Sequence, residues 1–104
     1  MAAATFLEIH QTEKYEGDDW WEWSIWVEGP ASELDQVDFV EYTLHPTFRN
    51  PVREVRDRSS NFKLSTGGWG GFDIYVRVVK KDKQVVPLQH ELVLHYPDGR
   101  PTDN

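Results

Sequence analysis

Few residues of this chain have the types and spacing that catalysis or metal binding requires. The histidines fall on or beside expected strands, with no partner four residues away and no carboxylate cluster beside them: His10, His45, His90 and His95. Metal sites need histidine and carboxylate side chains that converge, and the spacing suggests no such convergence. The chain has no cysteine, which excludes thiolate ligands, cysteine nucleophiles and disulfide bonds. The sequence therefore predicts a binding module, not an enzyme, with neither metal nor cofactor.

Two short segments stand out because they set aromatic rings beside a hydroxyl group or glycines. Residues 44–48 read Leu-His-Pro-Thr-Phe and follow an expected strand, whereas residues 67–72 read Gly-Gly-Trp-Gly-Gly-Phe and lead into one. If these strands run antiparallel, both segments lie at one end of the fold. Glycines permit positive φ and close approach, so Trp69 is expected to be presented to a ligand. A plain hairpin loop with Trp69 on the core, and a turn with Phe48 tucked into an edge, are the alternatives.

Strands must position these segments, because apolar and polar residues alternate with a period of two along most of the chain. The alternation is clearest over 20–28, 72–79 and 88–95, and weaker over 4–11, 37–44, 52–56 and 60–65. Turn residues separate the runs at 16–19, 29–30, 50–51, 67–68 and 80–83, and only 30–37 has room for a helical turn. The pattern predicts an all-β fold, an immunoglobulin-like β-sandwich of about seven to eight antiparallel strands.

The same alternation separates core side chains from exposed ones. Trp21 and Trp23 share a face with aliphatic residues and are expected in the core, whereas Trp26 points the other way, towards a sheet edge or a neighbouring domain. His90 alternates with leucines, which predicts a core histidine with a hydrogen-bonded ring. Trp20 falls beside a turn, and its role stays open.

Length and charge define the organisation of the chain. The 104 residues fit one domain, placed at 1–96, and the end at 97–104 is expected to be a flexible tail or linker. Residues 1–41 carry 11 acids and one base, net −10, and residues 42–104 carry 7 acids and 10 bases, net +3, which gives −7 overall. This balance disfavours nucleic acid, which needs a basic face. The acidic stretch 13–22 either attracts a cationic peptide or is a solvated loop.

Taken in order, these segments resemble one known family. The similar parts are Trp-Ser-Ile-Trp-Val-Glu-Gly-Pro at 23–30, the strand 37–44 with His-Pro-Thr-Phe at 45–48, and Gly-Gly-Trp-Gly-Gly-Phe at 67–72. Together with the alternating strands that follow, they look like a YEATS domain. The resemblance implies an immunoglobulin-like β-sandwich. The studied eukaryotic members read acetylated or crotonylated lysine on histone tails.

The resemblance also implies roles for single residues. Phe48 and Trp69 match the two aromatic residues that sandwich the acylated lysine side chain. Thr47 matches the hydroxyl residue that hydrogen-bonds the acyl amide, and His45 matches the histidine beside it. The chemistry is coherent, because a lysine ammonium is costly to bury, whereas its amide is neutral and planar, stacks between rings and needs polar partners once dry.

The glycine-rich loop carries the remaining matches. Gly68 and Gly70 flank the second aromatic residue, whose backbone N–H is expected to donate to the acyl carbonyl. Phe72 matches the aromatic residue just past the loop. The eukaryotic pattern also has an aromatic residue at the far end of the acyl channel, and Trp20 comes nearest to that place. Trp20 is therefore our candidate for lining the channel.

Two departures from the eukaryotic pattern favour the prokaryotic branch of the family. Residues 18–22 lack the histidine that usually precedes the early tryptophan, and Ser-Ser-Asn-Phe at 59–62 replaces a Pro-Pro-aromatic segment. Prokaryotic members are parts of larger bacterial proteins, which implies a multidomain, cytoplasmic protein; a eukaryotic one would be nuclear and bind histone-like tails. No apolar run approaches the ~18–20 residues of a membrane span, so we expect an intracellular protein without membrane association.

Three functions follow from these features. The first is a reader module for acetylated or crotonylated lysine in a peptide or protein tail. The second is a protein-interaction or scaffold domain of a larger bacterial protein, without acyl-lysine binding. The third is a carbohydrate-binding sandwich, because exposed tryptophan faces also stack on sugars. An open slot between Phe48 and Trp69 favours the reader, whereas a Trp69 ring collapsed on Phe48 or Phe72 favours the interaction domain.

Overall fold

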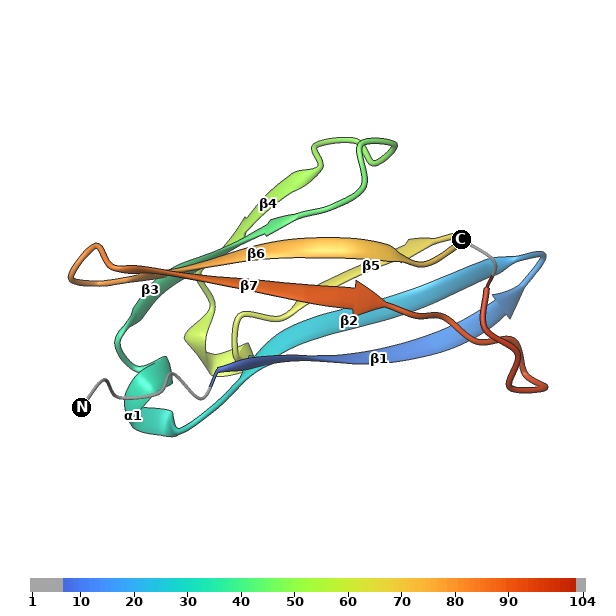
Figure 1. Ribbon diagram of the computed structural model, residues 1–104. Coiled ribbons are helices and arrows are strands. Elements are labelled where there is room, and N and C mark those ends of the chain that lie inside the picture. Colours follow the sequence, from blue (N-terminus) through green and yellow to red (C-terminus); the bar gives the residue numbers. More distant parts are fainter. Residues whose placement is uncertain (1–6, 103–104) are drawn as a thin grey trace.

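Two antiparallel β-sheets face each other in the computed structural model, which describes residues 7–102 (Figure 1). One sheet has the strand order β1–β2–β5 and the other has the order β4–β3–β6–β7. The strands are β1 (Glu8–Gly17), β2 (Trp20–Glu28), β3 (Val37–Thr43), β4 (Val52–Val55), β5 (Leu64–Gly68), β6 (Phe72–Lys80) and β7 (Val85–Leu92). The all-β sandwich predicted from the sequence is confirmed.

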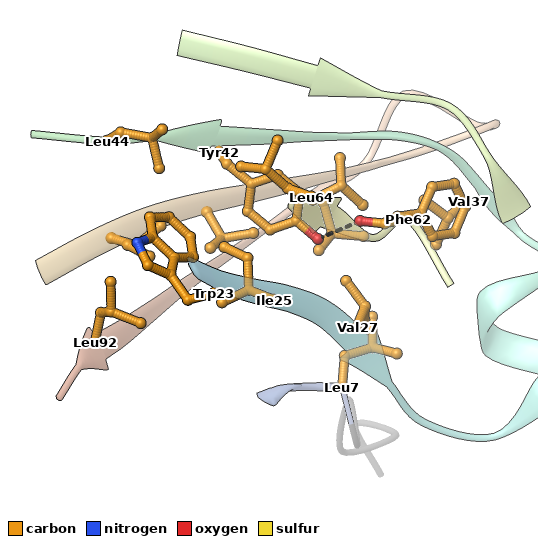
Figure 2. Close-up of a cluster of buried hydrophobic side chains, with 14 of the residues drawn as sticks. Leu7, Trp23, Ile25, Val27, Val37, Tyr42, Leu44, Phe62, Leu64 and Leu92 are labelled. Atoms are coloured by element: carbon orange, nitrogen blue, oxygen red, sulfur yellow. Dashed lines mark hydrogen bonds between the residues drawn. The ribbon is translucent and has the colours of Figure 1, made fainter. Parts of the chain in front are cut away.

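Side chains from the inner faces of both sheets form one core (Figure 2). On β2, Trp21 and Trp23 are buried with the aliphatic residues that alternate with them, as the period of two predicts. Tyr42 of β3 is also buried, and its hydroxyl donates a hydrogen bond of 2.6 Å to the Phe62 carbonyl. Burial raises the pKa of the Tyr42 phenol far above its ordinary value, so the hydroxyl keeps its proton and remains a donor.

Helices contribute little to the molecule. The helix α1 (Ala31–Leu34) and the 3-10 helix η1 (Arg58–Ser60) each make a single turn between strands. Asp57 caps η1, and hydrogen bonding by the Ser59 side chain, above all, lowers the pKa of its carboxyl. Over residues 7–102, no helix is long and apolar enough to cross a membrane. Strands and loops must therefore build any site.

The strand limits differ from the sequence pattern at three places. β1 continues to Gly17, so most of the acidic stretch 13–22 lies in strands and is not a solvated loop. The alternation missed this because the inward-facing residues of β1 include the polar Gln11 and Glu13. β5 spans Leu64–Gly68 instead of the expected 60–65, so Gly67 and Gly68 end this strand instead of forming a turn. The last strand, expected at 88–95, is shifted towards the N-terminus, and part of the expected run 4–11 lies outside the described residues.

Polar side chains close the sandwich where β1 meets β7. Gln11 donates to the Val93 carbonyl (3.0 Å) and accepts a hydrogen bond from the His90 ring (2.7 Å). Glu13 accepts hydrogen bonds from the backbone and the ring of His95. Desolvation, followed by repulsion from a neighbouring histidine, lowers the pKa of His90. The ring of His90 is hydrogen-bonded, as the sequence predicts, but the residue is partly buried at the join of the two sheets and does not lie in the core.

The segment after β7 folds back on the hairpin of β1 and β2 (Figure 1). The Tyr96 ring packs edge-on against Trp21, with 5.0 Å between ring centroids, and its hydroxyl donates to Asp19 (2.8 Å). The Thr102 backbone N–H donates to the carbonyl of Leu94, just after β7 (2.9 Å). These contacts tie Tyr96 and Thr102 to the sandwich. The domain limit at residue 96 remains a prediction.

Candidate functional site

The segment that follows β3 forms a tight turn. Leu44 is buried and donates its backbone N–H to the Pro51 carbonyl (2.7 Å), which closes the loop between β3 and β4. Within this loop, the Phe48 N–H donates to the His45 carbonyl (3.0 Å). The turn therefore holds His45, Thr47 and Phe48 close together.

Hydrogen bonds inside this turn fix the polarity of the Thr47 hydroxyl. The Thr47 backbone N–H donates to Nδ1 of His45 (3.2 Å), so this nitrogen carries no proton. The Thr47 hydroxyl lies 2.9 Å from the same nitrogen and therefore donates its only proton to it. The Thr47 oxygen is left as a hydrogen-bond acceptor, and the ligand group that it can take is an N–H.

The glycine-rich loop between β5 and β6 presents an exposed indole. Trp69 is 53% exposed, although Gly68, Gly70 and Gly71 around it are buried. None of these glycines adopts the positive φ that the sequence allows. Gly68 packs beside the pocket, where an added Cβ would lie in ordinary contact with the Phe48 ring at 3.5 Å.

The two segments line a common pocket of about 370 Å³, a volume in the range of small-ligand sites. Its lining consists of the seven residues predicted for the acyl-lysine site together with Gly71: His45, Thr47, Phe48, Gly68, Trp69, Gly70, Gly71 and Phe72. β3 and β6 pair antiparallel. The end of one strand and the start of the other therefore meet, as expected.

The aromatic rings leave a slot open beside Trp69. Phe48 and Phe72 lie 5.4 Å apart between ring centroids, tilted by 51°, and the His45 ring lies edge-on to Phe72 at 6.0 Å. Trp69 makes no ring contact with another aromatic side chain within residues 7–102. The indole has therefore not collapsed on either phenyl ring, which is the arrangement that favours a ligand in the slot.

Comparison with known proteins shows which family the chain matches. The family model of the prokaryotic YEATS domain matches residues 21–93, most of the chain. This chain belongs to the YEATS family. The resemblance seen in the sequence, including its closeness to the prokaryotic branch, is confirmed by this match.

Relatives of this YEATS domain carry the similar region within longer proteins. The Protein AF-9 homolog of Saccharomyces cerevisiae is 36% identical over 88 residues, which cover 79% of this chain and 37% of that protein. The Transcription initiation factor TFIID subunit 14 of Schizosaccharomyces pombe is 37% identical over 67 residues, which cover 60% of this chain and 27% of that protein. The chain thus spans well under half the length of these relatives.

Solved YEATS domains share the architecture. The Yaf9 YEATS domain recognizing an H3K122suc peptide superimposes with a TM-score of 0.70 at 26% identity, covering 99% of this chain and 93% of that chain. The Yaf9 YEATS domain bound to H3K27ac has the same TM-score and identity and covers 98% and 84%. The sandwich described above is therefore the YEATS fold.

Trp23 supports the pocket from the core, a contribution that its position in the sequence did not reveal. Its ring meets Phe48 and Phe72 edge-on, at 6.3 Å and 5.9 Å between centroids. The side chain is 2% exposed, and its indole N–H has no hydrogen-bond partner within residues 7–102. The sequence signal was only the alternation on β2, which placed Trp23 in the core but not behind these rings.

Gly71 is the lining residue that the sequence did not single out. Its backbone N–H donates to the Thr102 hydroxyl (3.3 Å), so the segment after β7 braces the loop that carries Trp69. No sequence signal indicated this contact, because the two residues lie 31 positions apart.

Trp20 does not line this pocket. It lies on the outer face of the three-stranded sheet, 44% exposed, with its indole against Gly67. There it lines a separate, open hollow of about 690 Å³ together with residues of β1, β2 and β5. Its role in lining an acyl channel remains a prediction.

Acidic side chains border the pocket on the side of β7. Asp73 and Glu91 are directly opposed on β6 and β7, and both are exposed. With Phe72 and Thr102, among others, they line a hollow of about 340 Å³. Neither carboxylate forms a salt bridge within residues 7–102. This border therefore carries unpaired negative charge next to the aromatic pocket.

Proposed function

We propose that this YEATS domain binds a lysine side chain acylated on its terminal nitrogen, within a peptide or protein tail, and acts as a binding module without catalysis. The observation that carries the proposal is the open slot at Trp69 beside a Thr47 oxygen that only accepts hydrogen bonds. The printed ligands of the similar Yaf9 domains, H3K122suc and H3K27ac, support it, because both are acylated lysines.

The lining of the pocket suits an amide better than an ammonium. Its lining residues supply aromatic faces and glycine backbone but no carboxylate, and Asp73 and Glu91 lie outside this lining. A free lysine ammonium in the pocket would therefore lose hydration without a carboxylate in direct contact. The amide of an acylated lysine is neutral and planar. Its flat face can lie against Phe48 and Trp69, and an unsaturated group such as crotonyl extends this contact.

The two polar ends of the amide also have partners. The amide N–H donates to the Thr47 oxygen, because the Thr47 O–H already donates to Nδ1 of His45. The acyl carbonyl accepts from a backbone N–H of the Trp69 loop. A dry amide whose donor and acceptor are both satisfied avoids the cost of about 1–3 kcal/mol for each unpaired polar group. The pocket therefore selects acylated over free lysine.

Titration with peptides that differ only in acetyl, crotonyl or no modification on one lysine tests the proposal. NMR shifts are expected at the Trp69 indole and the amides of 68–72, only with the acylated peptides, with affinity in the micromolar range or weaker. The Trp69→Ala variant should lose the response, and Trp26→Ala, at the other end of β2, should keep it. No acyl-dependent change up to millimolar peptide contradicts the proposal and favours an interaction or scaffold domain.

A further inference from the structure

We infer that the outer face of the three-stranded sheet is a second subsite, which takes a lysine or arginine side chain of the same peptide. This inference rests on the proposed function, because it takes the partner to be a peptide with an acylated lysine. The subsite is the open hollow of about 690 Å³ lined by Trp20 and Glu22 of β2, Lys14 of β1, and Ser65 and Gly67 of β5, among others. We call it the Trp20 groove.

Gly67 has no side chain, and this leaves room for the Trp20 indole to lie on the sheet. Gly67 pairs with Glu22 across the two strands, on the face where Trp20 lies. A Cβ on Gly67 would lie 2.9 Å from Nε1 of Trp20, closer than real Cβ atoms approach, and 3.0 Å from the Trp21 carbonyl oxygen, which is also tight. Glycine thus leaves the room that the indole occupies, and the 44% exposure of Trp20 leaves ring surface open to a ligand.

A second outward-facing tryptophan on the same strand shows what such an indole binds. The Lys63 ammonium lies 5.7 Å from the ring centroid of Trp26, a cation–π contact within the domain. Lys63 stands just before β5, whereas the residue of β5 against Trp20 is Gly67. No cation of residues 7–102 lies over the Trp20 ring. Trp20 therefore offers the same kind of face to a cation from outside.

Acidic side chains outnumber basic ones around this face. Glu22 lies two residues from Trp20 on the same side of β2, and it forms no salt bridge within residues 7–102. Lys14, the basic residue of the groove, lies opposite Glu22 on β1, and its ammonium pairs with Glu16 at 3.6 Å instead of with Glu22. The two aspartates of the turn 18–19 add charge next to Trp20. A guanidinium or ammonium is attracted here, whereas an anion is repelled.

The groove and the acyl-lysine pocket adjoin. Gly67 lines the groove and Gly68, the next residue of β5, lines the pocket. β5 is the outermost strand of its sheet, so a peptide can pass from one site to the other around a free edge. An extended chain spans about 3.5 Å per residue. We therefore place over Trp20 a cation two or three positions from the acylated lysine, about 7–10 Å along an extended chain.

The experiment compares two crotonyl-lysine peptides that carry arginine or glutamine two or three positions from the modified lysine. We expect the arginine peptide to bind wild type about 3- to 10-fold more tightly, as a cation–π contact beside a carboxylate implies. In Trp20→Ala this advantage should vanish, while the preference for crotonylated over unmodified lysine persists. Trp20→Tyr should retain part of the advantage, and Trp26→Ala should retain all of it.

Equal weakening of both peptides by Trp20→Ala, or an arginine preference that survives both Trp20→Ala and Glu22→Gln, would overturn the inference. If wild type shows no preference for crotonylated over unmodified lysine, the proposed function itself is contradicted. The groove is then tested alone with a tetra-arginine peptide, followed by NMR at the Trp20 indole. A shift that Trp20→Ala abolishes supports a cation subsite. No shift, or a shift caused by neutral oligosaccharides and not by arginine, overturns it.

Discussion

At the scale of single residues, a histidine decides what a threonine can bind. Nδ1 of His45 accepts two hydrogen bonds from Thr47, one from its backbone N–H and one from its hydroxyl. A hydroxyl that is usually both donor and acceptor thereby becomes an acceptor towards the pocket. This property distinguishes the amide N–H of an acylated lysine from groups that offer only an oxygen.

Replacing Thr47 tests this arrangement. Thr47→Val keeps the shape of the side chain but removes the oxygen, so the buried amide N–H of the ligand loses its partner. We expect the dissociation constant for a crotonyl-lysine peptide to rise about tenfold, which corresponds to about 1.4 kcal/mol. Isothermal titration or NMR measures the change, and Thr47→Ser, which retains the hydroxyl, should stay close to wild type. Wild-type affinity in Thr47→Val would show that the hydroxyl does not contact the ligand.

At the scale of elements, the two faces of β2 contribute to different parts of the molecule. The inner face of β2 supplies Trp21 to the core and Trp23 to the back of the pocket, while its outer face carries Trp20 and Trp26. The pattern predicted β2 closely because its inner residues are all apolar. β1 was predicted poorly because it turns polar residues inward, where they form hydrogen bonds with β7 and with the residues just after it instead of packing.

The hydrogen bond from Tyr42 ties β3 to the segment that leads into β5. Tyr42→Phe leaves the Phe62 carbonyl without its buried partner, so we expect the free energy of unfolding to fall by about 1–3 kcal/mol. Urea denaturation followed by tryptophan fluorescence measures the loss. Tyr75→Phe removes the same hydroxyl from a 55% exposed side chain and should change stability by less than about 0.5 kcal/mol. Equal effects of the two variants would contradict the role given to this bond.

At the scale of the whole molecule, the sandwich depends on pH through the join between its sheets. Desolvation, and then the charge of His10, lowers the pKa of His90 in the folded state below its ordinary value of 6.5. Just below pH 6.5 the unfolded chain therefore binds more protons than the folded one, and stability falls as the pH decreases. His90→Gln removes the titrating ring. We expect its stability to fall less steeply than that of wild type between pH 7 and 5 in urea denaturation. Parallel pH profiles would show that His90 is not responsible.

The uneven distribution of charge predicts a dependence on salt. The acidic stretch 13–22 forms the ends of β1 and β2 and the turn between them, and it includes part of the Trp20 groove. If it attracts a basic peptide, affinity should fall as salt rises from about 50 to 200 mM, because the Debye length shortens to about 8 Å or less. A crotonyl-lysine peptide of zero net charge is the control and should respond little. Equal salt dependence of the two peptides would show that this stretch does not attract the basic peptide.

The sequence by itself determined the sandwich, its core tryptophans and the two segments that line the pocket. These follow from alternation and from short motifs, because the direction of a side chain on a strand is set locally. The tertiary structure decided the rest: Trp23 lies behind the phenyl rings, Thr102 braces Gly71, and Trp20 lies over Gly67 on the outer face. Such contacts join strands that are distant in the chain, and strand register and sheet packing, which no local pattern encodes, fix them.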